Sequence, residues 1–570
     1  MPTMAMLHAF ITIDVAALLV LLHIANFAEP TVAFVLPPQQ RCEPKSGLER
    51  NPPCHLSGLK TDVENSVEIP TAKTTETETW DDQVIRWVDG ILGHKSEHSP
   101  FAIEKASENS MTYEWIAADQ NSHKYDKETK SARNVALRTT GQPLLDADSI
   151  ALIRDTAENL WEHQKRSESS SSRFTLQFED TNSECHLEEL VASDPTGNLQ
   201  QVVDDLLVNK VYPMVRSAFG GDTEDRYGLT EGSLCVYDSL VVRYNGDKAM
   251  DRFGASQPLH GDGGVVSVNI ALNPYRGDNE EDIPDTFSGG GTFFEDMIEL
   301  PNDNKDSDDD YDPILRPSAT GHALAHWSIH RHAGAPTRSG TRDILVIFLT
   351  QNKALSQTRF NGIERSFQLK LKARELPPEQ REMALRCLDL AIEKCPCDAQ
   401  AYFWKGFYLI QGGQPIPGEC GSVHQHRWNE IQQSIECFEK AKDCAPFDAK
   451  ISCYASMAYR QRWMFAQQQK PDEQREEDIE IAASYLERAL LLHKNYCKHG
   501  ISSDFDDNAN TAKITLAEVY LQQKRYHSAM EFLTSLHSQE EKEPSMSEAM
   551  ILHISKLSDH CHEQLEGKLR

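Results

Sequence analysis

The sequence predicts a multidomain protein in which an antiparallel β-sandwich or β-barrel is followed by an all-α region. Three observations support this fold class. The chain has 570 residues, which is too long for a single hydrophobic core. Short β-rich runs separated by Gly, Pro and Asp occupy the middle of the chain. After about residue 375 the β pattern ends and apolar residues recur at helical spacing.

The N-terminal segment 1–33 is predicted to be a signal peptide. Its apolar core, Val15–Leu22, is followed by small residues, Thr31 and Ala33, at the positions that signal peptidase prefers before a cut. The first basic residue is Arg41, so no positive charge precedes the core, and an uncleaved N-terminal anchor is the alternative. We therefore expect the secretory pathway or the lumen of the endoplasmic reticulum, and a membrane association only if the segment is uncleaved.

A second address also fits this segment. The Ala33-Phe34 junction resembles the two-part presequences that direct proteins into secondary plastids. The following stretch, 34–142, is predicted to be largely a disordered linker, because its first part is rich in Pro, Thr, Glu and Lys. Residues 80–142 contain scattered tryptophans but no pattern that assigns an element.

The elements of the central region follow in chain order. Apolar residues at helical spacing behind an Asp predict a helix over 144–165, and a second helix fits 199–219. The period then changes to that of β-strands. The predicted strands cover 235–244, 265–272, 292–294, 322–332 and 343–349.

Charge and cysteine usage exclude several functions. The net charge of −31 argues against a nucleic-acid partner and against docking on an anionic membrane surface. The acidic runs 278–282 and 303–312 are predicted to be solvated loops, and the second lacks the glycine turn and closing Glu of an EF-hand. The 13 cysteines are scattered, which favours small buried hydrophobic residues over a disulfide framework. Cys395–Cys397 and His560–His562 lack a second ligand pair at zinc spacing.

One group of residues points to metal chemistry. His260 and Asp262 lie two positions apart among glycines, so strand alternation places both on one face. A histidine from a distant strand would complete the two-histidine, one-carboxylate triad that holds non-haem iron(II). His326, His330 and His332 are separated by even numbers of residues, so all three would lie on one face of a single strand. The spacing from His332 to Arg342 favours His332. Arg342 could bind the carboxylate of an anionic cosubstrate.

These motifs resemble a known family. Residues 143–355 are similar to the iron(II)/2-oxoglutarate dioxygenases, and among them to prolyl 4-hydroxylase catalytic domains. The matching pieces, in family order, are Val241 to Tyr244, His260 to Asp262, Leu272 with Asn273, Gly289 to Phe293, Gly321 to Leu324, and His332-x-Gly-x-Pro-Thr-x-x-Gly-x-Arg342.

The resemblance implies a double-stranded β-helix, or jelly-roll barrel, with iron inside. It implies His260, Asp262 and His332 as iron(II) ligands and Arg342 as the residue that binds the distal carboxylate of 2-oxoglutarate. Tyr244 is a further candidate for a hydrogen bond to that cosubstrate, although it precedes His260 by sixteen residues, which is a long gap. The implied chemistry consumes 2-oxoglutarate and O2, releases succinate and hydroxylates a C–H bond, and L-ascorbate keeps the iron reduced in many such enzymes.

The C-terminal region 375–570 contains a repeated segment. Pro396 and Pro446 occupy equivalent positions fifty residues apart, each between two helical patterns. That spacing equals a tetratricopeptide period of about 34 residues plus an insert, which Gln411–Trp428 supplies. The region resembles a tetratricopeptide-like solenoid of about three to four helix pairs, with a plain helical bundle as the alternative. Such an array would bind a protein or a peptide.

The function that the sequence predicts is hydroxylation of a protein or peptide, with prolyl residues as the expected target, by a 2-oxoglutarate- and iron(II)-dependent dioxygenase. One alternative is a tetratricopeptide-type protein-binding scaffold whose barrel does not turn over. Another keeps the same iron chemistry but acts on lysyl residues or on a small molecule. The iron ligands alone do not choose among substrates, because substrate choice depends on loops at the mouth of the barrel.

Overall fold

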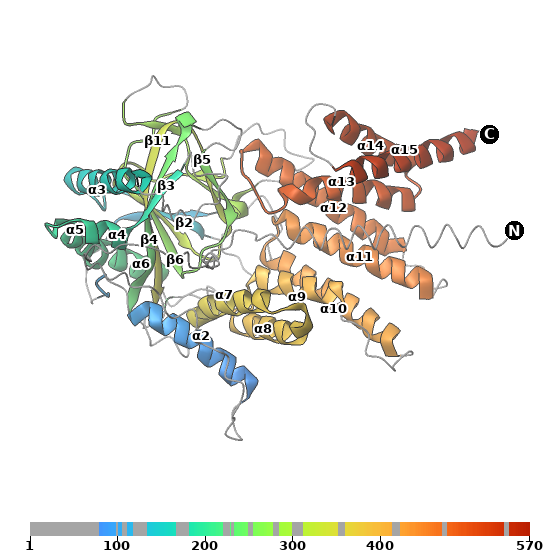
Figure 1. Ribbon diagram of the computed structural model, residues 1–570, viewed down its shortest axis with the longest axis horizontal. Coiled ribbons are helices and arrows are strands. Elements are labelled where there is room, and N and C mark those ends of the chain that lie inside the picture. Colours follow the sequence, from blue (N-terminus) through green and yellow to red (C-terminus); the bar gives the residue numbers. More distant parts are fainter. Residues whose placement is uncertain are drawn as a thin grey trace, which may run out of the picture. The chain divides into compact units, whose positions relative to one another are not determined.

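The structure is a computed structural model (Figure 1). It describes residues 79–97, 101–104, 111–117, 134–166, 182–220, 229, 233–248, 255–277, 284–298, 312–351, 359–412, 422–469, 476–540 and 547–569. The predicted signal peptide or anchor lies outside the described residues, as do nearly all residues of the two acidic runs. In the part of the chain that is described, no helix has the length and apolar character needed to cross a membrane.

An antiparallel β-sheet forms the centre of the N-terminal half. Its strands are β1 (Tyr113–Ala117), β2 (Asn134–Thr139), β3 (Asn182–His186), β4 (Leu234–Asn245), β5 (Ala255–His260), β6 (Val266–Ala271), β7 (Phe287–Gly289), β8 (Thr292–Phe294), β9 (Ile314–Leu315), β10 (Ala323–Trp327) and β11 (His332–Gln351). The main strand order is β1-β2-β10-β6-β11-β4-β3. The antiparallel β core that the sequence predicts is therefore present.

The long strand β11 belongs to two sheets. Its second half pairs with β4 and β6 in the main sheet. Its first half pairs instead with β5, β7 and β8, and the register shifts at several points between His332 and Ser339. Such bulges bend a strand, so β11 passes from one sheet into the other. This bend brings the start of β11 next to the end of β5.

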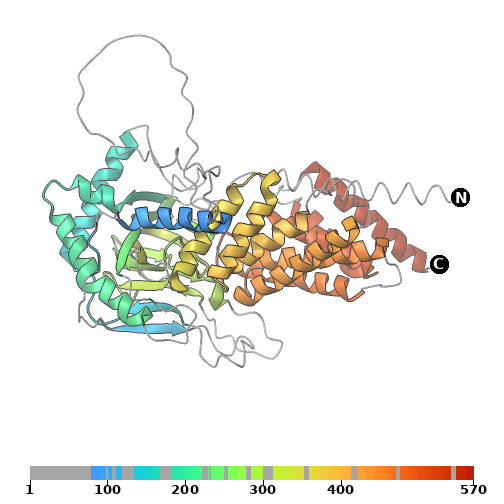
Figure 2. The same ribbon diagram turned by 90° about the horizontal axis from the view of Figure 1, so that it is seen from below.

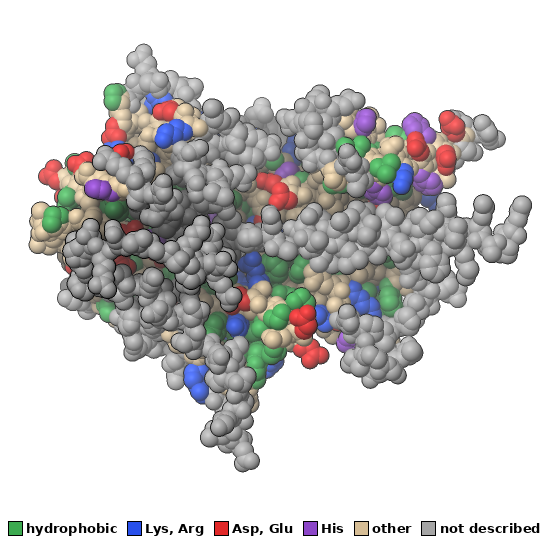
Figure 3. All heavy atoms as spheres, viewed as in Figure 1, with side chains coloured by type: hydrophobic (Ala, Val, Ile, Leu, Met, Phe, Trp, Pro, Cys, Tyr) green, Lys and Arg blue, Asp and Glu red, His purple; other side chains and the backbone are tan. Residues whose placement is uncertain are grey.

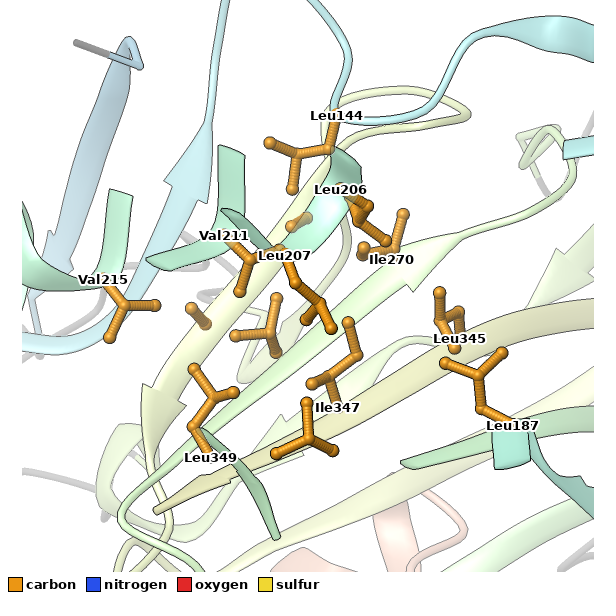
Figure 4. Packing of buried hydrophobic residues seen from close by; sticks show 14 of the residues in the cluster. Leu144, Leu187, Leu206, Leu207, Val211, Val215, Ile270, Leu345, Ile347 and Leu349 are labelled. Atoms are coloured by element: carbon orange, nitrogen blue, oxygen red, sulfur yellow. The ribbon is translucent and has the colours of Figure 1, made fainter. Parts of the chain in front are cut away.

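Helices cover the outer face of the main sheet. They are α3 (Ala147–Arg166), α4 (Leu187–Ser193), α5 (Asn198–Leu206), a π-helical turn η1 (Leu207–Val211) and α6 (Tyr212–Phe219). The predicted helices over 144–165 and 199–219 correspond to α3 and to the continuous run α5–η1–α6. Figure 4 shows Leu207 near Ile347, Leu206 beside Ile270 and Leu187 beside Leu345, all in one hydrophobic cluster. Alternate residues of β11 thus build the outer core, and the others face inward.

We predict that Leu345→Ala lowers the free energy of unfolding by about 2–5 kcal/mol, because a fully buried leucine leaves a cavity in this outer core. The neighbouring Val346→Ala is the matched control, since Val346 faces the other side of the sheet and is only partly buried. Urea unfolding followed by tryptophan fluorescence would measure both variants. Equal losses would contradict the assignment of the two faces.

Part of the range 34–142, which the sequence predicts to be largely linker, forms a helix and strands. A helix, α2 (Trp80–Glu97), and the strands β1 and β2 lie inside that range. Val84 and Val88 of α2 pack against α7 (Arg359–Glu375), and Figure 2 shows the two helices side by side. In β2, Val135 and Leu137 are fully buried and the strand pairs with β10. The short apolar runs gain their order from partners distant in sequence.

The C-terminal region is helical, as predicted. After α7 its helices are α8 (Arg381–Lys394), α9 (Ala399–Gln411), α10 (Ser422–Cys444), α11 (Ala449–Gln469), α12 (Glu476–Lys498), α13 (Asp506–Gln522), α14 (Tyr526–Glu540) and α15 (Glu548–Leu569). Each of them packs mainly against its neighbours in the sequence. This pattern of local packing is what a stacked helical array requires.

The repeated segment has a common local structure. The carboxylate of Asp398 accepts hydrogen bonds from the backbone N–H groups of Gln400 and Ala401 at the start of α9. Asp448 does the same for Lys450 and Ile451 at the start of α11. Both aspartates therefore act as helix N-caps two residues after the repeated proline.

The described cysteines behave as the sequence predicts. All ten are free thiols, and seven of them are buried. Burial raises the pKa of Cys235 and of Cys387 to about 12.

Figure 3 shows basic and acidic side chains interspersed among the described residues of one face, with no large basic patch there.

Candidate metal centre

The two candidate histidines are cross-strand neighbours. His260 ends β5 and His332 begins β11, and the two residues lie opposite each other in the antiparallel pair. Side chains at opposite positions share one face of a sheet, and the two imidazole centroids are 4.6 Å apart. Asp262 follows β5 by two residues, where its N–H donates to the carbonyl oxygen of Ser328 at 2.9 Å. The structure thus brings together the three residues that the sequence singled out.

The potential ligand atoms of these residues lie within 4.8 Å of one another. Nε2 of His260 is 3.3 Å from Oδ1 of Asp262, and Nε2 of His332 is 3.4 Å from Oδ2. Within the described ranges this is the one group of three or more His, Cys, Asp or Glu side chains arranged to hold a metal ion. Among the described residues, Cys395–Cys397 and His560–His562 are not part of this group.

Backbone carbonyl groups fix the tautomer of both histidines. Nδ1 of His260 lies 2.7 Å from the carbonyl oxygen of Pro258, and Nδ1 of His332 lies 2.9 Å from that of His330. A carbonyl only accepts, so Nδ1 carries the hydrogen in each ring. In the neutral ring Nε2 then presents its lone pair toward Asp262. This is the arrangement that metal-binding histidines need.

Asp262 is ionised, and one of its two carboxylate oxygens has no hydrogen-bond partner. Burial acts to raise the pKa of its carboxyl group, but the nearby His332 and His260 outweigh burial and hold that pKa well below its usual range. Its Oδ2 accepts a hydrogen bond from Ser267 at 2.5 Å. Its buried Oδ1 has no hydrogen-bond partner. A cation between the carboxylate and the two Nε2 atoms would satisfy Oδ1, so the residues fit a metal ion.

The two other histidines of the same parity have different surroundings. His330 is bonded through Nδ1 to Asp296 at 2.7 Å. His326 is fully buried, and its ring centroid lies 4.3 Å from that of His332. Burial lowers the pKa of His326 to about 4 and that of His332 to about 3, which favours the neutral form of each ring. The buried Nε2 of His326 has no hydrogen-bond partner, which the sequence pattern did not predict.

Arg342 is a buried cation without a carboxylate. It lies in β11 on the inward face, where its Nη1 donates to the carbonyl oxygen of Gly291 at 3.1 Å. No carboxylate of the described residues forms an ion pair with it, and burial lowers its pKa to about 10. Arg342 forms no ion pair with the adjacent Asp343. Asp343 faces the opposite side, where it pairs with Arg154 at 2.9 Å and Arg243 at 2.7 Å.

Glycine and small polar residues surround Arg342. Gly290 has a φ of 62°, and a Cβ atom there would lie 2.9 Å from Cδ of Arg342, so a larger residue would displace the guanidinium group. The buried hydroxyl group of Thr337 lies beside Gly290 and has no hydrogen-bond partner. Tyr244 is also adjacent, because the guanidinium carbon of Arg342 lies 5.2 Å from the centre of its ring. The Tyr244 hydroxyl group donates to Gln257 at 3.4 Å.

Comparisons with known proteins add little beyond this geometry. No family model matches the chain, and no curated protein matches it. AviO1 from Streptomyces viridochromogenes Tue57 is 16% identical over 38% of this chain and 90% of its own, with a TM-score of 0.25. The non-heme alpha ketoglutarate dependent epimerase SnoN from nogalamycin biosynthesis is 13% identical over 38% and 77%, with a TM-score of 0.25. An oxidoreductase of the 2OG-Fe(II) oxygenase family from Burkholderia pseudomallei is 18% identical over 27% and 57%, with a TM-score of 0.17. At such TM-scores, function has to be inferred from the residues of the site.

Proposed function

We propose that this chain is an iron(II)- and 2-oxoglutarate-dependent dioxygenase whose iron ligands are His260, Asp262 and His332. The observation that carries the proposal is the buried triad itself: two Nε2 atoms and one ionised carboxylate converge, and one carboxylate oxygen lacks a partner. Two neutral imidazoles and one carboxylate are the donor set that non-haem iron(II) oxygenases use.

The burial of Arg342 also supports the proposal. A buried guanidinium group without a carboxylate is destabilising unless an anion binds to it. The distal carboxylate of 2-oxoglutarate is such an anion, and a guanidinium fork can bind it through two parallel hydrogen bonds. Thr337 and Tyr244 are the neighbouring hydroxyl groups that could complete this pocket.

The chain's own residues have separate tasks in this proposal. Iron(II) supplies the activation of O2 when it is bound. His260 and His332 present fixed lone pairs because backbone carbonyls hold their Nδ1 hydrogens. Ser267 orients the carboxylate of Asp262 through its hydrogen bond, and Arg342 orients the cosubstrate. The apolar surroundings of the site, which include Phe294 beside His332, keep bulk water away.

The finer assignments belong to the same proposal. The two-sheet core with its bent shared strand supports a double-stranded β-helix, and the locally packed helices with repeated N-caps support a tetratricopeptide-like array. We propose a protein or peptide as the substrate, held by that array, with prolyl residues as the target and L-ascorbate as the reductant. The sequence of segment 1–33 supports the secretory pathway.

The proposal is tested by titrating the purified protein anaerobically with iron(II) and 2-oxoglutarate, and then measuring succinate release in air. We expect both ligands to bind and succinate to form only when O2 is present. Succinate should form slowly even without a protein substrate, because uncoupled turnover needs none. His260→Ala should abolish both results. If wild-type protein bound neither ligand, the dioxygenase would be excluded and the helical scaffold would become the working part of the chain.

A further inference from the structure

The helical region contacts both strands that carry the candidate histidine ligands. The contacts come from residues 499–505, the loop between α12 and α13. The carbonyl oxygen of Ser502 accepts a hydrogen bond from the N–H of Leu259 at 2.9 Å. The carboxylate of Asp504 accepts one from Arg331 at 3.4 Å. Leu259 directly precedes His260, and Arg331 directly precedes His332. One loop therefore holds the residue before each histidine.

Arg331 is the centre of a buried ionic cluster. Its Nε lies 3.1 Å from Glu295 and 3.4 Å from Asp448, and its Nη2 lies 3.4 Å from Asp504. Lys450 adds a second cation, 2.8 Å from Asp504. Of the three carboxylates, only Glu295 belongs to the β domain, where it begins the short 3₁₀ helix η3 (Glu295–Met297) after β8. The other two belong to the helical region, so the guanidinium group joins the two parts.

Tyr496 of α12 ties Glu295 into the same cluster. The hydroxyl group of Tyr496 lies 2.7 Å from Oε1 of Glu295 and is also bonded to the carbonyl oxygen of Phe447. One hydroxyl hydrogen cannot serve both oxygens. A protonated Glu295 resolves this, because it donates to Tyr496, which then donates to Phe447. Burial raises the pKa of Glu295 to about 8, in agreement with this arrangement. The cluster then contains two cations, two anions and one neutral acid.

Apolar packing follows the same path. Leu259, Phe293 and Ala333 of the β domain belong to one hydrophobic cluster with residues of the helical region, among them Tyr496 and Phe505. Ala333 directly follows His332. Residues on either side of His332, and the residue before His260, are thus held by helices rather than by the β domain alone.

We infer that the helical region is a positioning part of the metal centre, with Arg331 as the residue through which the α12–α13 loop fixes His332. The inference rests on the proposed function. A metal ion selects its ligands by geometry, and loss of a supporting contact around a ligand costs about 10- to 100-fold in metal affinity. By linkage, metal binding also stabilises the contact between the two parts. A partner bound to the helices could then alter the metal centre.

The test compares two full-length variants by Co(II) titration, with the ligand-field spectrum as the readout. Arg331→Lys keeps the charge but loses the guanidinium fork. Arg462→Lys is the matched control, because Arg462 forms a buried two-point pair with Asp478 inside the helical region, at 2.9 and 2.6 Å. We expect Arg331→Lys to weaken Co(II) binding about 10- to 100-fold and to change the spectrum, and Arg462→Lys to do neither.

Asp504→Asn provides a second variant if Arg331→Lys fails to fold, and it should weaken Co(II) binding in the same direction. Unchanged Co(II) affinity and an unchanged spectrum in folded Arg331→Lys or Asp504→Asn would overturn the inference alone. If wild-type protein bound no Co(II), the proposed function would fall with it. The two failures are therefore distinguishable.

Discussion

Asp262→Asn is expected to weaken iron(II) binding more than about 100-fold while the metal-free protein remains folded. The amide has the shape of the carboxylate and can keep the hydrogen bond from Ser267. Its NH2 group can also donate to the lone pair on Nε2 of His260 or His332. It cannot supply the negative charge that a divalent cation needs in a buried site. Asp262→Asn should therefore leave the metal-free fold intact and yet weaken metal binding.

Anaerobic calorimetry with iron(II) would measure the affinity, and circular dichroism with heating would follow the fold. The matched control is Asp238→Asn. Asp238 forms another aspartate–histidine pair, 3.1 Å from His186, away from the triad. It should leave the iron(II) affinity unchanged. If Asp262→Asn bound iron(II) as tightly as wild-type protein, the triad would not be the iron site.

Strand β11 shows how far periodicity could predict the fold. The run 343–349 was predicted as a strand because it is rich in β-branched and other apolar residues. The preceding stretch from His332 to Gly340 contains four residues that break a strand pattern: three glycines or prolines and the exposed Arg338. The structure continues β11 through it, because β5, β7 and β8 pair with this half. Those partners are distant in sequence, so no local pattern reveals them.

The choice among the three histidines shows a similar limit. Parity placed His326, His330 and His332 on one face, as if they belonged to one strand. In the structure β10 ends at Trp327 and β11 begins at His332, with a turn between them. The turn between these strands breaks the alternation of side chains, and His330 forms a hydrogen bond with Asp296 instead. The motif from His332 to Arg342 nevertheless picked the residue that joins the cluster, because it encodes a spacing along one continuous strand.

Interactions between distant segments could not be predicted from the sequence. Arg331 lies next to the predicted ligand, yet nothing local distinguishes it from an exposed arginine. Its carboxylate partners Asp448 and Asp504 lie more than a hundred residues further along the chain. The hydroxyl group of Ser267 was likewise hidden in a strand whose residues are nearly all buried. Such contacts depend on how elements pack, which periodicity does not encode.

Arg342→Gln is expected to raise the KM for 2-oxoglutarate at least about 30-fold without changing the affinity for iron(II). Removing one partner of a buried charge pair costs about 2–5 kcal/mol, and each 1.4 kcal/mol is tenfold in affinity. Arg316→Gln is the matched control, since Arg316 lies near the same glycine-rich strand but has its own carboxylate partner, Asp312, at 3.6 Å. It should change the KM only slightly. Steady-state succinate release would measure both variants.

Arg342→Gln should impair cosubstrate binding but stabilise the fold of the ligand-free protein. Burial lowers the pKa of Arg342 to about 10, which means that the folded state holds this cation less favourably than water does. Arg342→Gln should therefore raise the melting temperature without cosubstrate, provided that the amide finds a hydrogen bond such as the carbonyl oxygen of Gly291. 2-Oxoglutarate should raise the melting temperature of wild-type protein and not that of the variant. A variant that is less stable without cosubstrate and still protected by it would show that Arg342 supports the fold instead of holding the anion.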